Sequence, residues 1–154
     1  MSRWMVLFVF LFALSGVVGL APGNEAQAEE SSHKINAKGV GQDLGGGVTI
    51  ADVKGGGLLN GTTEGNFAIT GGAFPVFTIS GTVDFMVNKG TLTVSIDGTF
   101  DVSTGEFSAS GPVIGATGKL AGATGTLTFK GVEDLSDGSF VEDITGQISV
   151  DLSP

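Results

Sequence analysis

The chain beyond residue 33 is dominated by segments in which apolar and polar positions alternate. The clearest runs over residues 77–87, where Phe, Ile, Val and Gly alternate with Thr, Ser and Asp, and residues 92–102 repeat the pattern. Successive side chains of a β-strand point to opposite faces, so this alternation predicts strands with one buried face. No segment shows the period of 3.6 residues that a helix requires.

Weaker segments of the same kind bring the number of predicted strands to eight. The first starts at Lys34, and the others cover 48–53, 59–70, 77–87, 92–102, 107–113, 126–131 and 140–152. Gly-containing turns of hairpin type separate several of them, at residues 88–90, 103–105 and 136–138. Eight short strands joined mainly by hairpins predict an all-β protein, either a sandwich or a barrel.

The glycines favour the barrel. Several fall in the apolar phase of their strands, where they allow a strand to coil sharply and leave space inside: Gly65, Gly81, Gly98, Gly111, Gly131 and Gly146. We therefore predict an eight-stranded, mainly antiparallel β-barrel. The inward phase predicts a shared core made of Ile79, Val83, Phe85, Val94, Ile96, Phe100, Phe129, Ile144 and Ile148.

The first 28 residues have the features of a secretory signal peptide. Arg3 supplies a positive charge, residues 5–14 are continuously apolar, and Ala26-Gln27-Ala28 matches an A-x-A cleavage site. An uncleaved membrane anchor is the alternative, but the apolar run is short for a bilayer span of about 20 residues. We expect a signal peptide over 1–28, a single barrel domain over 29–154, and a secreted or periplasmic protein.

Charge and composition narrow the classes of partner. The net charge is −9, and removing residues 1–28 leaves it unchanged, because Arg3 and Glu25 are the only charged residues there. A strongly acidic chain disfavours nucleic acids and, once the signal is cleaved, membrane surfaces. The chain has no Cys, and beyond residue 28 it has no Trp, Tyr or Arg. Most side chains used for acid–base or anion-binding chemistry are therefore missing, and we expect no cofactor.

A glycine-rich segment carries a resemblance to a known family. Residues 115–125 read GATGKLAGATG, and they follow the pattern G-x-[TA]-G-x-[FL]-x-x-A-x-G. This segment resembles the corner before a late strand in allene oxide cyclase and dirigent-protein barrels. The resemblance implies an eight-stranded antiparallel barrel with an apolar cavity, and a homo-oligomer, trimer or dimer. It does not extend to the families' Tyr, Arg, Trp and Cys site residues, so their chemistry does not transfer.

The candidate ligand site centres on one carboxylate. Glu142 falls in the apolar phase of the last strand, where burial would raise its pKa and allow it to donate a proton or anchor a ligand. The alternative is a solvated position at the barrel rim. The inward aromatic residues Phe85, Phe100, Phe107 and Phe129 either line a cavity with it or fill the core. Asp43 and Asp52 are weaker candidates of the same kind.

A metal site is not expected. The acidic run Glu133, Asp134 and Asp137 lacks the spacing of a calcium loop, and an Asp-Gly turn accounts for it. His33 is a lone His in a polar segment that we expect to be frayed.

Three hypotheses for function follow. The first is a non-catalytic secreted barrel that binds a small apolar molecule or serves as a scaffold. The second is a cyclase or isomerase of the allene oxide cyclase or dirigent type, in which the cavity orients a reactive substrate. The third is a structural or surface protein that works through its Ser/Thr-rich exterior. The missing Tyr, Arg, Cys and Trp favour the first over the second.

Overall fold

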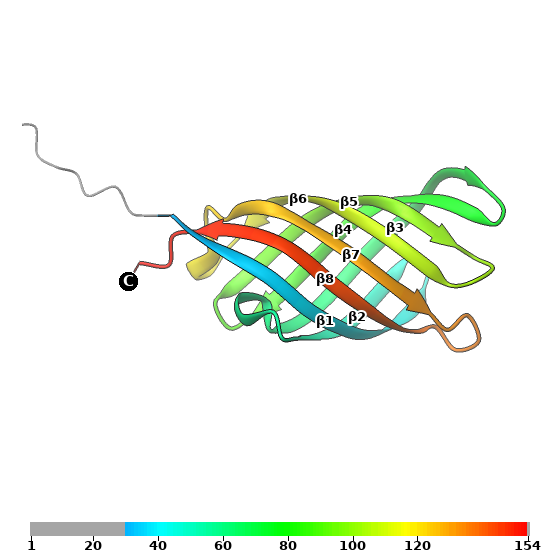
Figure 1. Ribbon diagram of the computed structural model, residues 1–154, viewed down its shortest axis with the longest axis horizontal. Coiled ribbons are helices and arrows are strands. Elements are labelled where there is room, and N and C mark those ends of the chain that lie inside the picture. Colours follow the sequence, from blue (N-terminus) through cyan, green and yellow to red (C-terminus); the bar gives the residue numbers. More distant parts are fainter. Residues whose placement is uncertain (1–29, 154) are drawn as a thin grey trace, which may run out of the picture.

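A computed structural model describes residues 30–153 and shows eight antiparallel strands that close into a barrel (Figure 1). The predicted signal peptide lies outside the described residues. Within them, no helix combines the length and apolarity that crossing a membrane requires. The strands are β1 (Ser31–Gly45), β2 (Val48–Lys54), β3 (Gly61–Ala73), β4 (Val76–Val87), β5 (Gly90–Asp101), β6 (Glu106–Ala116), β7 (Thr124–Glu133) and β8 (Ser139–Val150).

Pairing of the first and last strands closes the barrel. Each strand pairs with its neighbour in the chain, and β1 pairs with β8 from Ser31–Val150 to Gln42–Ser139. The sheet therefore has no unpaired edge that could recruit another strand. The two ends of the described chain consequently lie side by side at one end of the barrel (Figure 1).

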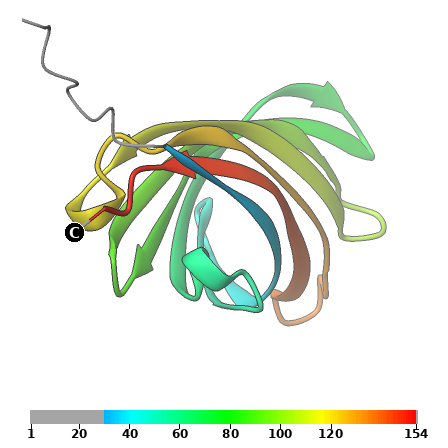
Figure 2. The ribbon, with the colours of Figure 1, turned by 60° about the vertical axis from the view of Figure 1, so that its left-hand side comes forward.

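That end is closed by two short 3₁₀ turns. η1 (Gly57–Leu59) leads into β3, and η2 (Gly118–Leu120) lies between β6 and β7. Leu59 and Leu120 are both fully buried, so each turn inserts a leucine into the core. Figure 2 shows η1 lying across the barrel opening at this end. The opposite end carries the β1–β2, β3–β4, β5–β6 and β7–β8 hairpins and has no such turn.

The predicted inward phase is confirmed along the strands. Most of the predicted core forms one buried cluster, and Ile79 and Phe100 are the exceptions. Both point inward but are half-buried, because they line a cavity rather than the packed part of the core.

Several predicted strand boundaries are wrong. β6 continues to Ala116, three residues beyond the predicted end at residue 113. Pro112 lacks an N–H, and the pairing of β6 with β7 ends there, opposite Thr126. Beyond it, Val113, Gly115 and Ala116 pair with β5, and this ladder carries the strand onward. The predicted start of the third strand at Leu59 is instead the 3₁₀ turn η1.

His33 was expected in a frayed segment but lies within β1. It pairs with Ile148 of β8, and its Nε2 atom is buried with no hydrogen-bond partner among the described residues. It is at the closed end of the barrel, far along β1 from the open end where Asp43 lies. The start of β1 is ordered because it pairs with β8, a contact that the sequence around His33 does not reveal.

Candidate functional site

An internal cavity of about 540 Å³ occupies the open half of the barrel. Its volume lies within the range of about 300–1,000 Å³ that is usual for small-molecule sites. Its walls are mainly aromatic and aliphatic, with a few polar groups. The lining includes Thr63, Phe67, Ile69, Ile79, Val83, Ile96, Phe100, Phe107, Ala109, Phe129 and Phe140, with Asp43, Glu133 and Glu142 as its charged members.

One row of cross-strand pairs organises the aromatic and acidic parts of this cavity. Phe77 pairs with Phe100, and Phe100 pairs with Phe107. The row continues from Phe107 to Gly131 and from Gly131 to Glu142. Three aromatic side chains and one carboxylate therefore follow one another around the inner wall from β4 to β8.

Glycines on both sides make room for Glu142. Its partners in the ladder are Gly39 of β1 and Gly131 of β7. A Cβ at Gly39 would lie 2.6 Å from Oε1 of Glu142, so the carboxylate rests directly over that glycine. A Cβ at Gly131 would lie 2.9 Å from Cβ of Glu142 and closer still to the Phe107 ring. The Phe107 ring thus reaches across Gly131 toward the carboxylate.

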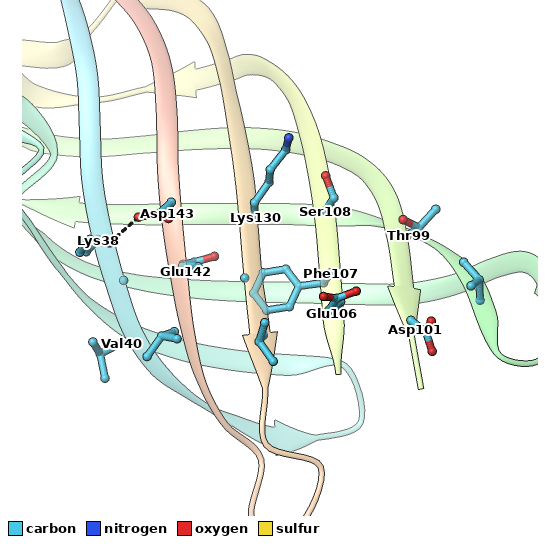
Figure 3. Close-up of a pocket in the computed structure, with 15 residues that line it drawn as sticks. Lys38, Val40, Thr99, Asp101, Glu106, Phe107, Ser108, Lys130, Glu142 and Asp143 are labelled. Atoms are coloured by element: carbon cyan, nitrogen blue, oxygen red, sulfur yellow. Dashed lines mark hydrogen bonds and ion pairs between the residues drawn. The ribbon is translucent and has the colours of Figure 1, made fainter. Parts of the chain in front are cut away.

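Glu142 has an unusual electrostatic environment. Burial raises the pKa of its carboxyl to about 7 from the ordinary value of 4.5. No side-chain hydrogen bond or ion pair to this carboxylate is formed within residues 30–153. The neighbouring cation Lys38 lies on the outer face of the wall, where its Nζ donates to Oδ1 of Asp143 at 2.7 Å (Figure 3). The carboxyl is therefore close to half ionised at neutral pH.

A second hollow, of about 830 Å³, lies over the outer wall of β1, β8, β7, β6 and β5 (Figure 3). Its rim carries Lys38, Lys130 and Asp143, and Glu142 and Phe107 also contribute to its lining. They reach both hollows because Gly39 and Gly131 leave the wall between them without side chains. The inner cavity is the better candidate site, because it gathers the phenylalanines and the buried carboxylate.

Two further carboxylates lie in the cavity lining, near its open end. Asp43 is near the end of β1, and Glu133 is the last residue of β7. The pKa of Glu133 is raised, first by burial and second by the negative charge of Asp43. Oδ1 of Asp43 accepts a hydrogen bond from the Gly45 N–H at 2.6 Å. This part of the lining is therefore acidic.

The predicted site residues divide into two groups. Glu142, Phe100, Phe107 and Phe129 line the cavity together, whereas Phe85 does not. Phe85 is fully buried, and its ring centroid lies 6.1 Å from that of Phe129. It is thus part of the packed core that supports a cavity residue.

Among the lining residues that the sequence did not mark as ligand-site candidates are two polar ones, Glu133 and Thr63, and the aromatic Phe140. Glu133 and Phe140 could have been found, because each continues the inward alternation of its strand by one step. The Phe140 ring packs edge-on against Phe107, with centroids 6.0 Å apart. Thr63 is only 5% exposed, and its hydroxyl interrupts a wall that the sequence analysis treats as apolar or small.

The acidic turn has a local explanation, as the sequence analysis expected. Oδ1 of Asp134 accepts hydrogen bonds from the N–H and hydroxyl of Ser136, at 2.9 and 2.6 Å. Oδ1 of Asp137 accepts one from the Ser139 N–H at 2.8 Å. No group of three His, Cys, Asp or Glu within residues 30–153 is placed to hold a metal ion. Asp52 is exposed on the outer face of β2 and takes no part in the inner cavity.

We expect Glu142→Gln to stabilise the protein at alkaline pH and to have little effect in acid. Between pH 4.5 and about 7 the folded protein holds a proton at Glu142 that the unfolded chain has released. The free energy of unfolding therefore falls as pH rises through this window, by about 1.4 kcal/mol per pH unit. Gln removes the penalty, so chemical denaturation at about pH 8 should show a gain of a few kcal/mol over wild type.

The raised pKa of Glu142 can also be checked directly by NMR. The side-chain carboxyl ¹³C resonance of Glu142 should titrate near neutral pH, whereas that of the exposed Glu64 serves as a reference. Titration of Glu142 at the ordinary glutamate pKa of 4.5 would place its carboxyl in water and remove it from the site.

Comparisons with known proteins do not assign the chain to a family. No protein-family model matches the sequence, and no curated protein matches it. The fold and the cavity are therefore the grounds on which a function can be argued.

Proposed function

We propose that this protein is a secreted, non-catalytic β-barrel that binds a small, mainly apolar molecule in its inner cavity. The observation that carries the proposal is a 540 Å³ cavity whose walls are largely phenylalanine and aliphatic side chains. Burying the apolar surface of a ligand there is favourable by about 25 cal/mol per Å². The closed β-ladder holds the walls in place without a ligand, so binding requires little ordering of the chain.

The first test uses a neutral apolar probe, 1-decanol, and NMR spectra of the methyl groups. Binding in the cavity should shift the methyl signals of Ile79, Val83 and Ile96, which line it. The exposed methyl groups of Val40 and Val132 should not move. Shifts confined to the exterior valines, or no saturable shifts at all, would overturn the proposal.

A matched pair of variants tests the location independently. Ile79→Trp fills the cavity, whereas Thr78→Trp places the same ring on the outer face of the same strand. We expect the first to weaken decanol binding by about tenfold or more and the second to leave it unchanged. Native mass spectrometry of protein purified from its own host would then look for a retained molecule.

A cyclase or isomerase of the allene oxide cyclase or dirigent type is the second candidate, and one observation favours it. Glu142 combines a pKa near neutrality with a position among aromatic side chains, which suits a general acid. In such an enzyme, Glu142→Gln would abolish turnover while decanol binding persisted. If neither binding nor turnover is found, the Ser/Thr-rich exterior becomes the working surface.

A further inference from the structure

The charged groups that line the cavity are all acidic. Asp43, Glu133 and Glu142 contribute three carboxylates, and among residues 30–153 no Lys, Arg or His joins the lining. The nearby lysines Lys38 and Lys130 belong to the outer phase of β1 and β7 and are exposed. The cavity therefore offers a ligand an apolar body site and negative charge, without a compensating cation from the protein.

Glu142 lacks a polar partner on its own wall. Its cross-strand neighbours are glycines, and the side chain next along the row is the Phe107 ring. A carboxylate buried among such groups is costly unless a positive charge or a hydrogen-bond donor meets it. No side chain within the described residues supplies one. Glu142 is half-buried and its carboxylate oxygens stay accessible, so a ligand or water in the cavity can take that role.

The hydroxyl of Thr63 is a second polar group in the cavity lining, separate from the carboxylates. Thr63 of β3 is 5% exposed and lines the cavity. Among residues 30–153 its hydroxyl makes no side-chain hydrogen bond. Thr63 is buried as a residue, yet its hydroxyl oxygen stays accessible from the cavity, where a polar group of a ligand or a water can bond to it.

We propose that the ligand of this cavity is an amphipathic cation, a hydrophobic amine whose ammonium group pairs with Glu142 and whose apolar body lies against Phe100, Phe107 and Phe129. The ammonium would neutralise the buried carboxylate and donate hydrogen bonds to it. The Phe107 ring, next along the row from Glu142, can also attract a cation to its face. This inference rests on the proposed function, because it names the class of ligand for the same cavity.

The acidic lining discriminates against anionic amphiphiles. A carboxylate ligand would meet Asp43, Glu133 and Glu142 without a lysine or arginine to receive it. Like charges in a partly desolvated site repel strongly. The lining carboxylates therefore disfavour the binding of fatty-acid-like molecules. The net charge of −9 also favours the approach of cations over anions.

The pH dependence of binding follows from the same geometry. An alkylammonium, with a pKa near that of lysine at about 10.4, stays charged below pH 9. Below neutral pH it must displace a proton from Glu142, so its affinity falls as the pH is lowered. Asp43 and Glu133 face the cavity from β1 and β7, and Lys38 and Lys130 lie on the outer face of the same two strands. A variant at Glu142 is therefore needed to isolate its contribution.

The experiment compares three probes with the same alkyl chain: decylamine, 1-decanol and decanoate. Isothermal calorimetry at about pH 8 should show decylamine binding about tenfold or more tightly than decanol, and decanoate more weakly than either. Glu142→Gln should greatly reduce the preference for decylamine over decanol. The preference for decylamine should shrink in wild type at about pH 6 and show little pH dependence in Glu142→Gln.

Glu64→Gln is the matched control. Glu64 is exposed on the outer face of β3, so the variant makes the same charge change away from the cavity. An equal loss of decylamine affinity in both variants would mean general attraction to an acidic protein and would overturn the inference. Decanol binding without a preference for decylamine would overturn the inference of a cationic ligand but leave the proposed function standing. Failure of every probe to bind would overturn the proposed function as well.

Discussion

Phe85→Ala is expected to lower the free energy of unfolding by about 3–5 kcal/mol. Phe85 is fully buried and packs against Phe129, so its removal leaves a void that the closed sheet cannot collapse to fill. Chemical denaturation of the purified protein measures the loss. Strand closure makes this position less able to relax than one at a sheet edge.

Two comparisons sharpen the result. Phe74→Ala is a matched control, because Phe74 is 77% exposed and its loss should change stability by less than about 0.5 kcal/mol. Phe100→Ala should cost less than Phe85→Ala, because Phe100 is half-buried and already borders empty space. Equal losses at Phe85 and Phe100 would contradict the placement of the cavity.

Gly125→Ala is expected to destabilise the protein by more than about 2 kcal/mol. Gly125 has φ +141°, a conformation that side chains rarely adopt, and it lies at the start of β7. A Cβ there would be 2.1 Å from the carbonyl oxygen of Gln147 in β8, so the strands would have to separate. Thermal unfolding by circular dichroism reports the loss as a lower midpoint temperature.

Gly115→Ala is the control for this prediction. Gly115 belongs to the same glycine-rich segment, but its φ is ordinary and a Cβ would lie 3.7 Å from the nearest atom, Cβ of Thr93. Its replacement should change stability by no more than about 0.5 kcal/mol. If both variants unfold at the wild-type temperature, close strand approach at Gly125 is not needed for folding.

Much of the inner wall could be predicted from the sequence. The period of two is a local property of a strand, so counting from Ile144 and Ile148 places Glu142 inside without knowledge of any neighbour. The same counting finds Phe100, Phe107 and Phe129. It also reaches Glu133, which the sequence analysis assigned to a turn because the strand was ended two residues too early.

The tertiary structure decided which inward residues meet. Glu142 lies over Gly39, more than a hundred positions earlier in the chain, because β1 and β8 close the barrel. The register of that pairing, and the register of β6, β7 and β8, puts Phe107 beside the carboxylate. Register depends on turn lengths and bulges around the whole ring, which no single segment encodes.

The division between core and cavity was likewise a tertiary outcome. The alternation assigns Phe85 and Phe100 to the same face, yet one is packed and the other borders open space. The difference arises because η1 and η2 insert Leu59 and Leu120 into one end of the barrel, while the hairpin end has no such turn. Strand phase is therefore a property of the local sequence, whereas the cavity, its acidic lining and the raised pKa of Glu142 arise from closure of the barrel.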